Sequence, residues 1–265
     1  DVRDNSMNNM RNHPVETVEG GSSIRILRYD AAQDSGGPGK WRGGMGQMLV
    51  VEVLCDNGYF LAAGIDRKRF RPWGIFGGHA ARGLKLIYNQ GRPDEREIIR
   101  IHELAMKKGD TLTILMPGGG GYGNPLERDP AAVLRDVAIG YVSPESARDD
   151  YGVVIADGKI DEQATADLRR SRTAVARPDF DFGPDREIWE SVFDDATMFA
   201  INEQLYKLPK AQRQDIRTDF FESVVPGIVV QTEKSFAELI PDPQTARARL
   251  KDALVALTAR AAAFN

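Results

Sequence analysis

The chain has 265 residues, a formal net charge of −4, 42% hydrophobic residues and 28% charged residues. This balance is typical of a soluble globular protein, and the length suits one large domain or two modest ones. The acidic balance argues against a nucleic-acid partner, and no apolar run approaches the ~18 residues that a membrane-spanning helix needs.

Glycine separates the chain into two halves, because 21 of its 26 glycines lie before residue 125. Glycine supplies the positive-φ positions of tight turns, so we predict a first half that is rich in strands and turns. Apolar alternation predicts strands in six segments, namely Ile24–Tyr29, Met48–Cys55, Phe60–Ile65, Leu84–Tyr88, Ile98–His102 and Thr111–Met116. Asp56-Asn57-Gly58 has the composition of a hairpin turn between two of these strands.

The second half is predicted to be helical. Asp129-Pro130, Ser143-Pro144 and Asp242-Pro243 each place an N-cap residue before a proline at the first helical position. Apolar residues at helical spacing mark two later helices, one with Trp189, Val192, Phe193, Ala196, Phe199 and Ala200, the other with Ala246, Leu250, Ala253, Leu254, Leu257 and Ala261. The predicted fold class is therefore α+β, with a glycine-rich, β-rich N-terminal half followed by a helical C-terminal half.

We expect three parts along the chain: a β-rich glycine-loop region at 1–126, the helical end of the same domain at 127–176, and a helical C-terminal extension at 177–265. Cys55 is the only cysteine, so no internal disulfide can form and a reducing, cytoplasmic location is expected. The chain has no signal-peptide pattern and begins with Asp1 rather than Met, which suggests a processed or truncated start.

The first glycine cluster, Asp34–Gln47, contains a Gly-Lys pair that invites comparison with a phosphate-binding loop. Trp41 stands where Ser or Thr would hold magnesium, and Asp34 stands where the opening glycine should be, so we reject that loop. Two interpretations stay open. The residue types favour a chain of turns that packs Trp41 beneath a sheet. The alternative is a backbone-dense loop that carries Lys40 and Arg42 toward an anion or an acidic partner surface.

The second glycine cluster, Met116–Pro125, spells G-x-G-x-x-G at Gly118, Gly120 and Gly123. A dinucleotide-binding turn must run directly into a helix that receives the pyrophosphate, whereas Asn124-Pro125 intervenes here. We therefore reject dinucleotide binding. The cluster is better interpreted as a close-packed backbone crossing or as a loop that lines a partner's active site.

Polar residues near both clusters are the candidate catalytic groups. Asn12 and His13 belong to an asparagine-rich stretch that either forms a solvated loop or orients a substrate carbonyl or a metal-bound water. Together with Lys40 and Arg42 they form the predicted site. His79 can act as a general base, although a histidine in a loop more often makes surface hydrogen bonds. No Ser-His-Asp order, Cys-His pair or H-E-x-x-H run is evident, and we assign no metal ligand and no cofactor-binding residue.

Taken together and in this order, the motifs resemble the hydantoinase B family, which includes subunits of N-methylhydantoinases, 5-oxoprolinases and the acetone and acetophenone carboxylases. The matching pieces are Asn8-Asn9 through Pro14-Val15-Glu16, Asp34 to Gly44, Pro72 to Gly78, Pro117 to Pro125, the Asp129-Pro130 helix, and Tyr141 to Glu145 with Tyr151 to Val154. Each piece alone is modest, but their common order over about residues 7 to 173 is specific.

The resemblance implies a subunit that acts with a hydantoinase A-like, ATP-binding partner. The joint enzyme phosphorylates a carbonyl oxygen, which makes that oxygen a good leaving group, and then hydrolyses a cyclic amide or carboxylates a ketone enol. ATP and a divalent metal are therefore expected in the whole complex and not on this segment alone. Family members are usually longer and carry their metal-binding His and Asp residues in the N-terminal half. This chain is thus similar to their C-terminal part, and the N-terminal half of its own subunit is a second expected partner.

The extension at 177–265 tilts the resemblance toward the ketone carboxylases, because carboxylase subunits carry such extensions. A cyclic amide hydrolase is the alternative enzyme. A third interpretation is a non-catalytic assembly domain whose glycine loops and helices serve only as interface. A free-standing nucleotide-binding protein is the weakest alternative, and we expect no binding of ATP or NAD to the isolated chain.

Overall fold

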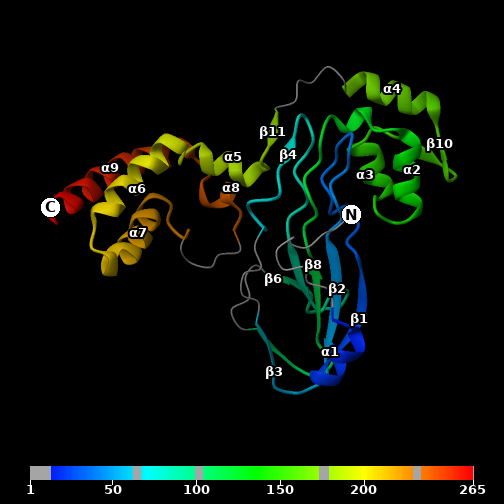
Figure 1. The fold of residues 1–265 in the computed structure, drawn as a ribbon, viewed down its shortest axis with the longest axis horizontal. Coiled ribbons are helices and arrows are strands. Elements are labelled where there is room, and N and C mark those ends of the chain that lie inside the picture. Colours follow the sequence, from blue (N-terminus) through cyan, green and yellow to red (C-terminus); the bar gives the residue numbers. More distant parts are fainter. Residues whose placement is uncertain (1–12, 62–66, 99–103, 173–178, 229–233, 265) are drawn as a thin grey trace. The chain divides into compact units, whose positions relative to one another are not determined.

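The structure is a computed structural model that describes residues 13–61, 67–98, 104–172, 179–228 and 234–264. The chain forms two compact units, unit 1 (Asp1–Gly183) and unit 2 (Pro184–Asn265). Strands gather in unit 1 and helices make up unit 2, as Figure 1 shows. The predicted α+β class, with its β-rich half followed by a helical half, is confirmed. The division at residues 126 and 176 stays a prediction.

Unit 1 is built on a five-stranded antiparallel sheet of order β1-β2-β8-β5-β6. Its strands are β1 (Ile24–Ala31), β2 (Gln47–Val53), β5 (Lys85–Tyr88), β6 (Arg96–Ile98) and β8 (Thr111–Leu115). Ile114 on the central strand β8 pairs with Leu49 on β2 and with Leu86 on β5. Residues paired across a ladder share a face, so the alternation seen in the sequence becomes one buried apolar surface.

The hairpin predicted at Asp56-Asn57-Gly58 is wrong. The strand after this turn, β3 (Gly58–Phe60), pairs with β7 (Leu104–Met106) instead of β2. Both edges of β2 are already bonded, one to β1 and the other to β8, so β2 has no free edge for a hairpin partner. Residues 62–66 and 99–103, which would complete two of the predicted strands, lie outside the described residues.

The remaining part of unit 1 is mostly helical. Its elements are α1 (Val15–Gly21), the 3-10 helix η1 (Pro125–Glu127), α2 (Pro130–Ala138), α3 (Pro144–Asp149), the hairpin of β9 (Ile155–Ala156) and β10 (Lys159–Ile160), and α4 (Glu162–Arg172). The predicted caps are confirmed: Asp129 accepts a hydrogen bond from the Ala131 N–H at 3.0 Å, and Ser143 accepts one from the Ser146 N–H at 3.0 Å. Val133 of α2 lies in a small apolar core between these elements.

Unit 2 contains α5 (Pro184–Glu190), α6 (Asp195–Lys207), α7 (Lys210–Val224), α8 (Phe236–Leu239) and α9 (Pro243–Ala262). Its core is separate from those of unit 1 and is built around Phe193, Ile201, Phe221 and Leu250. The apolar stripe predicted for the last helix is confirmed, since its six residues are buried or half-buried against this core. Among the described residues, no helix combines the length and the apolar composition that crossing a membrane requires.

The single helical stripe predicted from Trp189 to Ala200 is wrong. α5 ends at Glu190, and Asp194 caps a new helix by accepting a hydrogen bond from the Thr197 N–H at 2.8 Å. The break changes the helical phase, so α6 buries Ile201 and Leu205 and leaves Phe199 74% exposed. An Asp-Asp pair in front of a helical run was the sequence signal for this cap.

Candidate functional site

Three glycine-rich segments that lie far apart in the sequence form one backbone layer. The Gly37 N–H donates to the Gly119 carbonyl at 2.8 Å, the Gly119 N–H donates to Gly44 at 2.9 Å, and the Gly121 N–H donates to His79 at 3.0 Å. We call residues 35–46, 73–79 and 117–123 the glycine layer. Figure 1 shows these segments running side by side near β4 (Gly74–Ile75). The close-packed backbone crossing predicted for the second cluster is confirmed.

Glycine is needed in this layer because the backbones approach too closely for a side chain. A Cβ atom at Gly120 would lie 1.7 Å from the carbonyl oxygen of Trp73, and one at Gly121 would lie 1.9 Å from that of Pro38. Within the layer, all of which the structure describes, the glycines with positive φ are Gly77 and Gly123. The interpretation that glycine chiefly supplies positive φ is therefore wrong here, since close approach is the reason at most positions.

An apolar surface covers one side of the glycine layer. Trp41 and Ile75 each bridge to Tyr122, and Ile75 also pairs with Phe180 of β11 (Phe180–Asp181). Paired residues on neighbouring strands point to the same side, so these side chains form a row. Phe76 joins the row through an edge-to-face contact with Tyr122, at 5.4 Å between ring centroids. We call these five residues the aromatic face.

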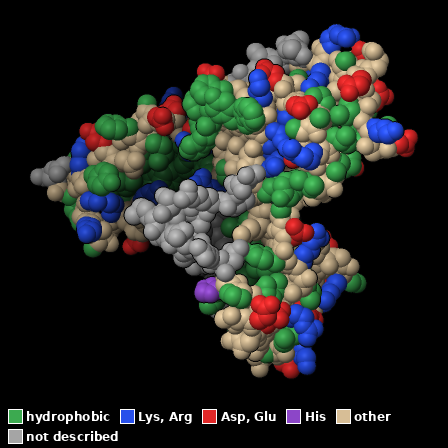
Figure 2. Space-filling model, turned by 45° about the vertical axis from the view of Figure 1, so that its right-hand side comes forward, with side chains coloured by type: hydrophobic (Ala, Val, Ile, Leu, Met, Phe, Trp, Pro, Cys, Tyr) green, Lys and Arg blue, Asp and Glu red, His purple; other side chains and the backbone are tan. Residues whose placement is uncertain are grey.

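The aromatic face is open to solvent. Trp41 is 66% exposed, Phe76 58%, Tyr122 51% and Phe180 50%. The prediction that Trp41 packs beneath a sheet is therefore wrong, because Trp41 lies beside Tyr122 on the open side of the glycine layer. Figure 2 shows hydrophobic side chains gathered near the top of the drawn face, at the height of β4 and β11 in Figure 1. Contiguous apolar patches of this kind mark binding surfaces, whereas single exposed apolar residues do not.

Arg42 lies in a buried ion cluster beside the glycine layer. Its Nε donates to Asp136 Oδ2 at 3.1 Å, and Arg128 Nη2 donates to the same oxygen at 2.8 Å. The three side chains are 8%, 10% and 4% exposed for Arg42, Arg128 and Asp136. The guanidinium of Arg42 also lies 5.3 Å from the centroid of the Tyr141 ring. This geometry ties the layer to α2 and turns Arg42 away from solvent.

The structure does not bring the side chains of Lys40 and His13 into the ion cluster of Arg42. Lys40 is half exposed and pairs with Glu127, with 3.2 Å between Nζ and Oε2. His13 is exposed just before α1, and Asn12 lies outside the described residues. The catalytic role of these four residues stays a prediction, and the described geometry gives Lys40 and Arg42 different surroundings.

A second polar cluster lies where the glycine layer meets α3. Arg82 donates to Ser146 Oγ at 2.7 Å and lies 3.7 Å from Asp34 Oδ2. Asp34 in turn accepts a hydrogen bond from the Ser143 N–H at 2.9 Å. Its backbone has a φ of 60°, a conformation that residues other than glycine rarely adopt. Asp34 is therefore held by α3 and by Arg82 at the entry to the layer.

Asp150, at the end of α3, belongs to the same cluster. Burial raises the pKa of its carboxyl group above the ordinary value, while the positive charges of Arg82 and His79 act in the opposite direction. A histidine and two carboxylates therefore lie at one edge of the glycine layer, and side chains of these types serve as general acids and bases in active sites. This cluster is the candidate site that the described residues themselves assemble.

Sequence reasoning found His79 but missed its neighbours. Asp150 gave no signal in the sequence, because it follows another aspartate in a charged helix, where a carboxylate usually faces solvent. Asp136 carried a usable signal, since it lies between Val133 and Val137 on the apolar side of a predicted helix, where a carboxylate must find a cation. The described residues contain no group of three or more His, Cys, Asp or Glu side chains arranged to hold a metal ion.

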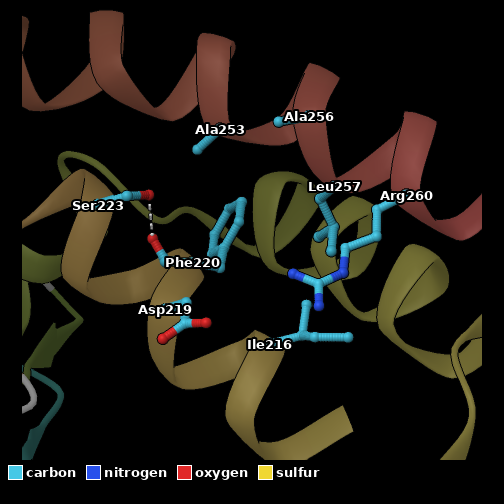
Figure 3. A pocket seen from close by; sticks show the side chains of 8 residues that line it. All are labelled: Ile216, Asp219, Phe220, Ser223, Ala253, Ala256, Leu257 and Arg260. Atoms are coloured by element: carbon cyan, nitrogen blue, oxygen red, sulfur yellow. Dashed lines mark hydrogen bonds between the residues drawn. The ribbon is translucent and has the colours of Figure 1, made fainter. Parts of the chain in front are cut away.

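Unit 2 has a pocket of its own between α7 and α9, which Figure 3 shows. Its volume is about 230 Å³, and it is lined by Ile216, Asp219, Phe220, Ser223, Ala253, Ala256, Leu257 and Arg260. The Arg260 side chain extends across it toward α7 in Figure 3, and the Ser223 hydroxyl donates to the Phe220 carbonyl at 2.7 Å. With few polar groups directed at a common point, this pocket is the seam of a helix packing interface.

Comparison with known proteins identifies relatives of the chain. Caprolactamase subunit beta of Pseudomonas jessenii is 36% identical over 159 residues, which is 57% of this chain and 27% of that protein. The solved ATP-dependent caprolactamase from the same organism has a TM-score of 0.54 at 34% identity, covering 59% of this chain and 28% of that one. A nucleotide-free structure of acetone carboxylase has a TM-score of 0.52 at 25% identity, covering 71% and 30%.

The chain spans 27–29% of the length of three curated relatives that it matches, so most of each relative has no counterpart here. Residues 1–125 match the family model described as hydantoinase B/oxoprolinase. This segment contains all three parts of the glycine layer and four of the five residues of the aromatic face. The resemblance to the hydantoinase B family that was drawn from the order of the glycine motifs is confirmed, because the first 125 residues match the model of that family.

Proposed function

We propose that this chain is the C-terminal portion of a hydantoinase B-like subunit in an ATP-dependent, multi-subunit enzyme that activates a carbonyl by phosphorylation. The observation that carries the proposal is the likeness of the chain both to an ATP-dependent caprolactamase and to an enzyme of ATP-dependent acetone carboxylation. Two different reactions on a shared scaffold have one step in common, the activation of a carbonyl oxygen. Attaching a phosphoryl group makes that oxygen a good leaving group.

Ketone carboxylation, of the acetone or acetophenone type, is our first candidate reaction. The helical unit after residue 183 supports it, as does the larger share of the chain that the acetone carboxylase structure covers, 71% against 59%. Hydrolysis of a cyclic amide is the second candidate. The higher identity to the caprolactamase structure, 34% against 25%, supports it.

In this proposal the glycine layer is a scaffold and docking surface rather than a nucleotide site. The aromatic face would pack against the N-terminal half of the same subunit, since an exposed apolar row of this size favours burial. ATP and a divalent metal would be bound by that half and by a hydantoinase A-like partner subunit. We expect the assembled complex in the cytoplasm, with a ketone or a cyclic amide as its small-molecule substrate.

The residues proposed to face the substrate are Asn12, His13, Lys40 and Arg42. If they do, alanine at His13 or Lys40 lowers turnover in the assembled complex and leaves its subunit composition unchanged. A non-catalytic assembly domain predicts the reverse, namely normal turnover per complex and weaker assembly. Alanine variants at Trp41 and Tyr122, on the aromatic face, serve as the matched control, because they should weaken assembly of the complex without removing a residue that faces the substrate.

The proposal is tested by purifying the native complex through a tag on this chain and identifying every subunit. ATP hydrolysis is then measured with a ketone plus bicarbonate and, separately, with a cyclic amide. Stimulation by the first supports a carboxylase, and stimulation by the second supports an amidohydrolase. The proposal fails if the isolated chain, free of other subunits, binds ATP or turns over either substrate at the rate of the complex.

A further inference from the structure

Unit 2 carries a positively charged groove between α6 and α7. The groove has a volume of about 330 Å³ and is lined by Asn202, Leu205, Tyr206, Lys210, Arg213, Gln214 and Arg217. Three of these side chains are cationic and none is acidic, which is unusual for a chain whose net charge is −4. We call these seven residues the basic groove.

The three cations form a row along one face of α7. Lys210, Arg213 and Arg217 are three and four residues apart, which places them on successive turns of the same helix face. At a rise of about 1.5 Å per residue, the row is about 10 Å long. It is therefore longer than a single carboxylate or phosphate group.

Arg213 is fixed in place at the middle of the row. Its Nη2 donates to the carbonyls of Tyr206 and Leu208, both at 3.1 Å, at the end of α6. Its guanidinium carbon lies 4.9 Å from the centroid of the Tyr206 ring, and its buried Nε has no hydrogen-bond partner. These contacts orient the guanidinium but supply no negative charge.

The acidic residues nearby do not neutralise the row. Glu203 on α6 lies 4.0 Å from Lys207 rather than from a groove residue. Asp215 and Asp219 of α7 each follow a cation of the row, Arg213 or Arg217, by two residues. Residues two apart lie on different sides of a helix, so these carboxylates project away from the row. In the part of the chain that the structure describes, no ion pair involves Lys210, Arg213 or Arg217.

We propose that the basic groove binds an acidic segment of another protein chain. Carboxylates spaced along such a segment would meet Lys210, Arg213 and Arg217 in turn, and the exposed ring of Tyr206 would cover its apolar stretch. Complementary charge steers two surfaces together and selects the partner. The length of the row favours an extended acidic segment over one small anion. The inference concerns unit 2 and does not depend on the reaction proposed for the complex.

The test measures binding of the full chain to a short fluorescein-labelled peptide in which Glu alternates with Ala. In the test variant, Lys210→Glu is combined with Arg217→Glu. The matched control combines Arg249→Glu with Lys251→Glu, which makes the same change in charge on exposed positions of α9. We expect the groove variant to bind about tenfold more weakly, or worse, because two attractive ion pairs become repulsive contacts. The control should stay within about twofold of the wild type.

Circular dichroism melts of both variants establish that each is folded, and titration of the wild type with inorganic phosphate distinguishes a small-anion site. Equal weakening by both double variants would show that only net charge matters and would overturn the proposal. The same holds if the peptide does not bind, or if phosphate displaces it completely at equal ionic strength. A binding constant that falls as salt is added, for the wild type but not for the groove variant, supports it.

Discussion

Single glycines decide whether the glycine layer can form, because neighbouring backbones occupy the space that a side chain would need. The three residues 119–121 show how local this constraint is. A Cβ atom at Gly120 or Gly121 would lie within 2 Å of a carbonyl oxygen, whereas one at Gly119 would meet its nearest atom, the Gly44 nitrogen, at 3.4 Å. Backbone atoms in a hydrogen-bonded layer cannot move aside as the end of a flexible side chain can.

Gly120→Ala is therefore expected to destabilise the fold strongly, by about 3 kcal/mol or more, because the layer must open to admit one methyl group. Gly119→Ala is the control next to it in the sequence. It should change the free energy of unfolding by less than about 1 kcal/mol, since the methyl group fits and the unfolded chain loses some freedom. Urea unfolding followed by fluorescence measures both. Equal losses in the two variants would mean that the layer does not pack as described.

Asp150 gives a second prediction at this scale. Because burial raises the pKa of its carboxyl group, the folded state holds the proton more tightly than the unfolded state does. Between the two pKa values the folded protein binds more protons, so stability falls as pH rises from about 3.9 through the higher folded value. The Asp150→Asn variant has no carboxyl group to ionise at this position, so it does not lose this stability as the pH rises. The variant should be more stable than the wild type at pH 7, and the difference should shrink toward pH 3.

Stability of the Asp150→Asn variant is best read from thermal melts at several pH values, with Asp149→Asn as the control on the exposed neighbour. If Asp150 also exchanges protons with His79 during turnover, the stabilised variant should lose activity in the assembled complex. A gain in stability that is constant across the pH range would contradict the buried-carboxyl explanation.

At the scale of elements, one carboxylate joins the glycine layer to the helical end of unit 1. Asp136 on α2 accepts hydrogen bonds from Arg42 of the layer and from Arg128 before the helix. All three side chains are almost fully buried, so removing the shared acid leaves two buried cations without a counter-charge. Removing either arginine leaves the other still paired with Asp136.

Asp136→Leu is accordingly expected to cost about 3–5 kcal/mol of stability, more than Arg42→Met or Arg128→Met costs. The measurement is chemical unfolding of the three single variants. The double variant Arg42→Met with Asp136→Leu should recover part of the loss, because one of the two stranded charges is then gone. If Arg42→Met proved as damaging as Asp136→Leu, the single acid would not be the common partner of both cations.

Elements whose signal is local could be predicted from the sequence. The strands on β1, β2, β5 and β8 follow apolar alternation, and the helices that start at Asp129-Pro130 and Ser143-Pro144 follow capping chemistry that involves only adjacent residues. The hairpin at Asp56 to Gly58 failed because strand pairing depends on which edges are free, and β8 takes the edge of β2 from 60 residues further along the chain.

The candidate site was less predictable than the fold, for a related reason. Glycine motifs indicate that backbones approach closely, but they do not show which segments meet. For this reason Trp41 was predicted to lie beneath a sheet, whereas it lies on the exposed aromatic face. Arg42 was grouped with Lys40 because the two are neighbours in sequence. Their surroundings differ because the partners come from different parts of the chain: Lys40 pairs with exposed Glu127, whereas Arg42 pairs with buried Asp136 of α2. Asp150 becomes a site residue through Arg82 and His79, which lie far away in the chain.

At the scale of the whole molecule, the two units have separate cores. The core of unit 2 contains Ile201, which is fully buried, and all of its described members come from after residue 184. The small core that contains Val133, also fully buried, lies wholly in unit 1. Units that share no core behave as separate cooperative units unless a large apolar interface joins them.

We therefore expect two unfolding transitions that respond to different substitutions. Ile201→Ala should destabilise unit 2 by about 2–5 kcal/mol, because it deletes buried methyl groups and leaves a cavity, and should leave amide exchange in the sheet of unit 1 unchanged. Val133→Ala is the reciprocal variant and should act on unit 1 alone. Hydrogen exchange read by mass spectrometry separates the two, since peptides from 13–172 and from 184–264 report each unit. A single transition that both variants lower equally would show that the units unfold together, and that the helical extension is part of one folding domain with the glycine layer.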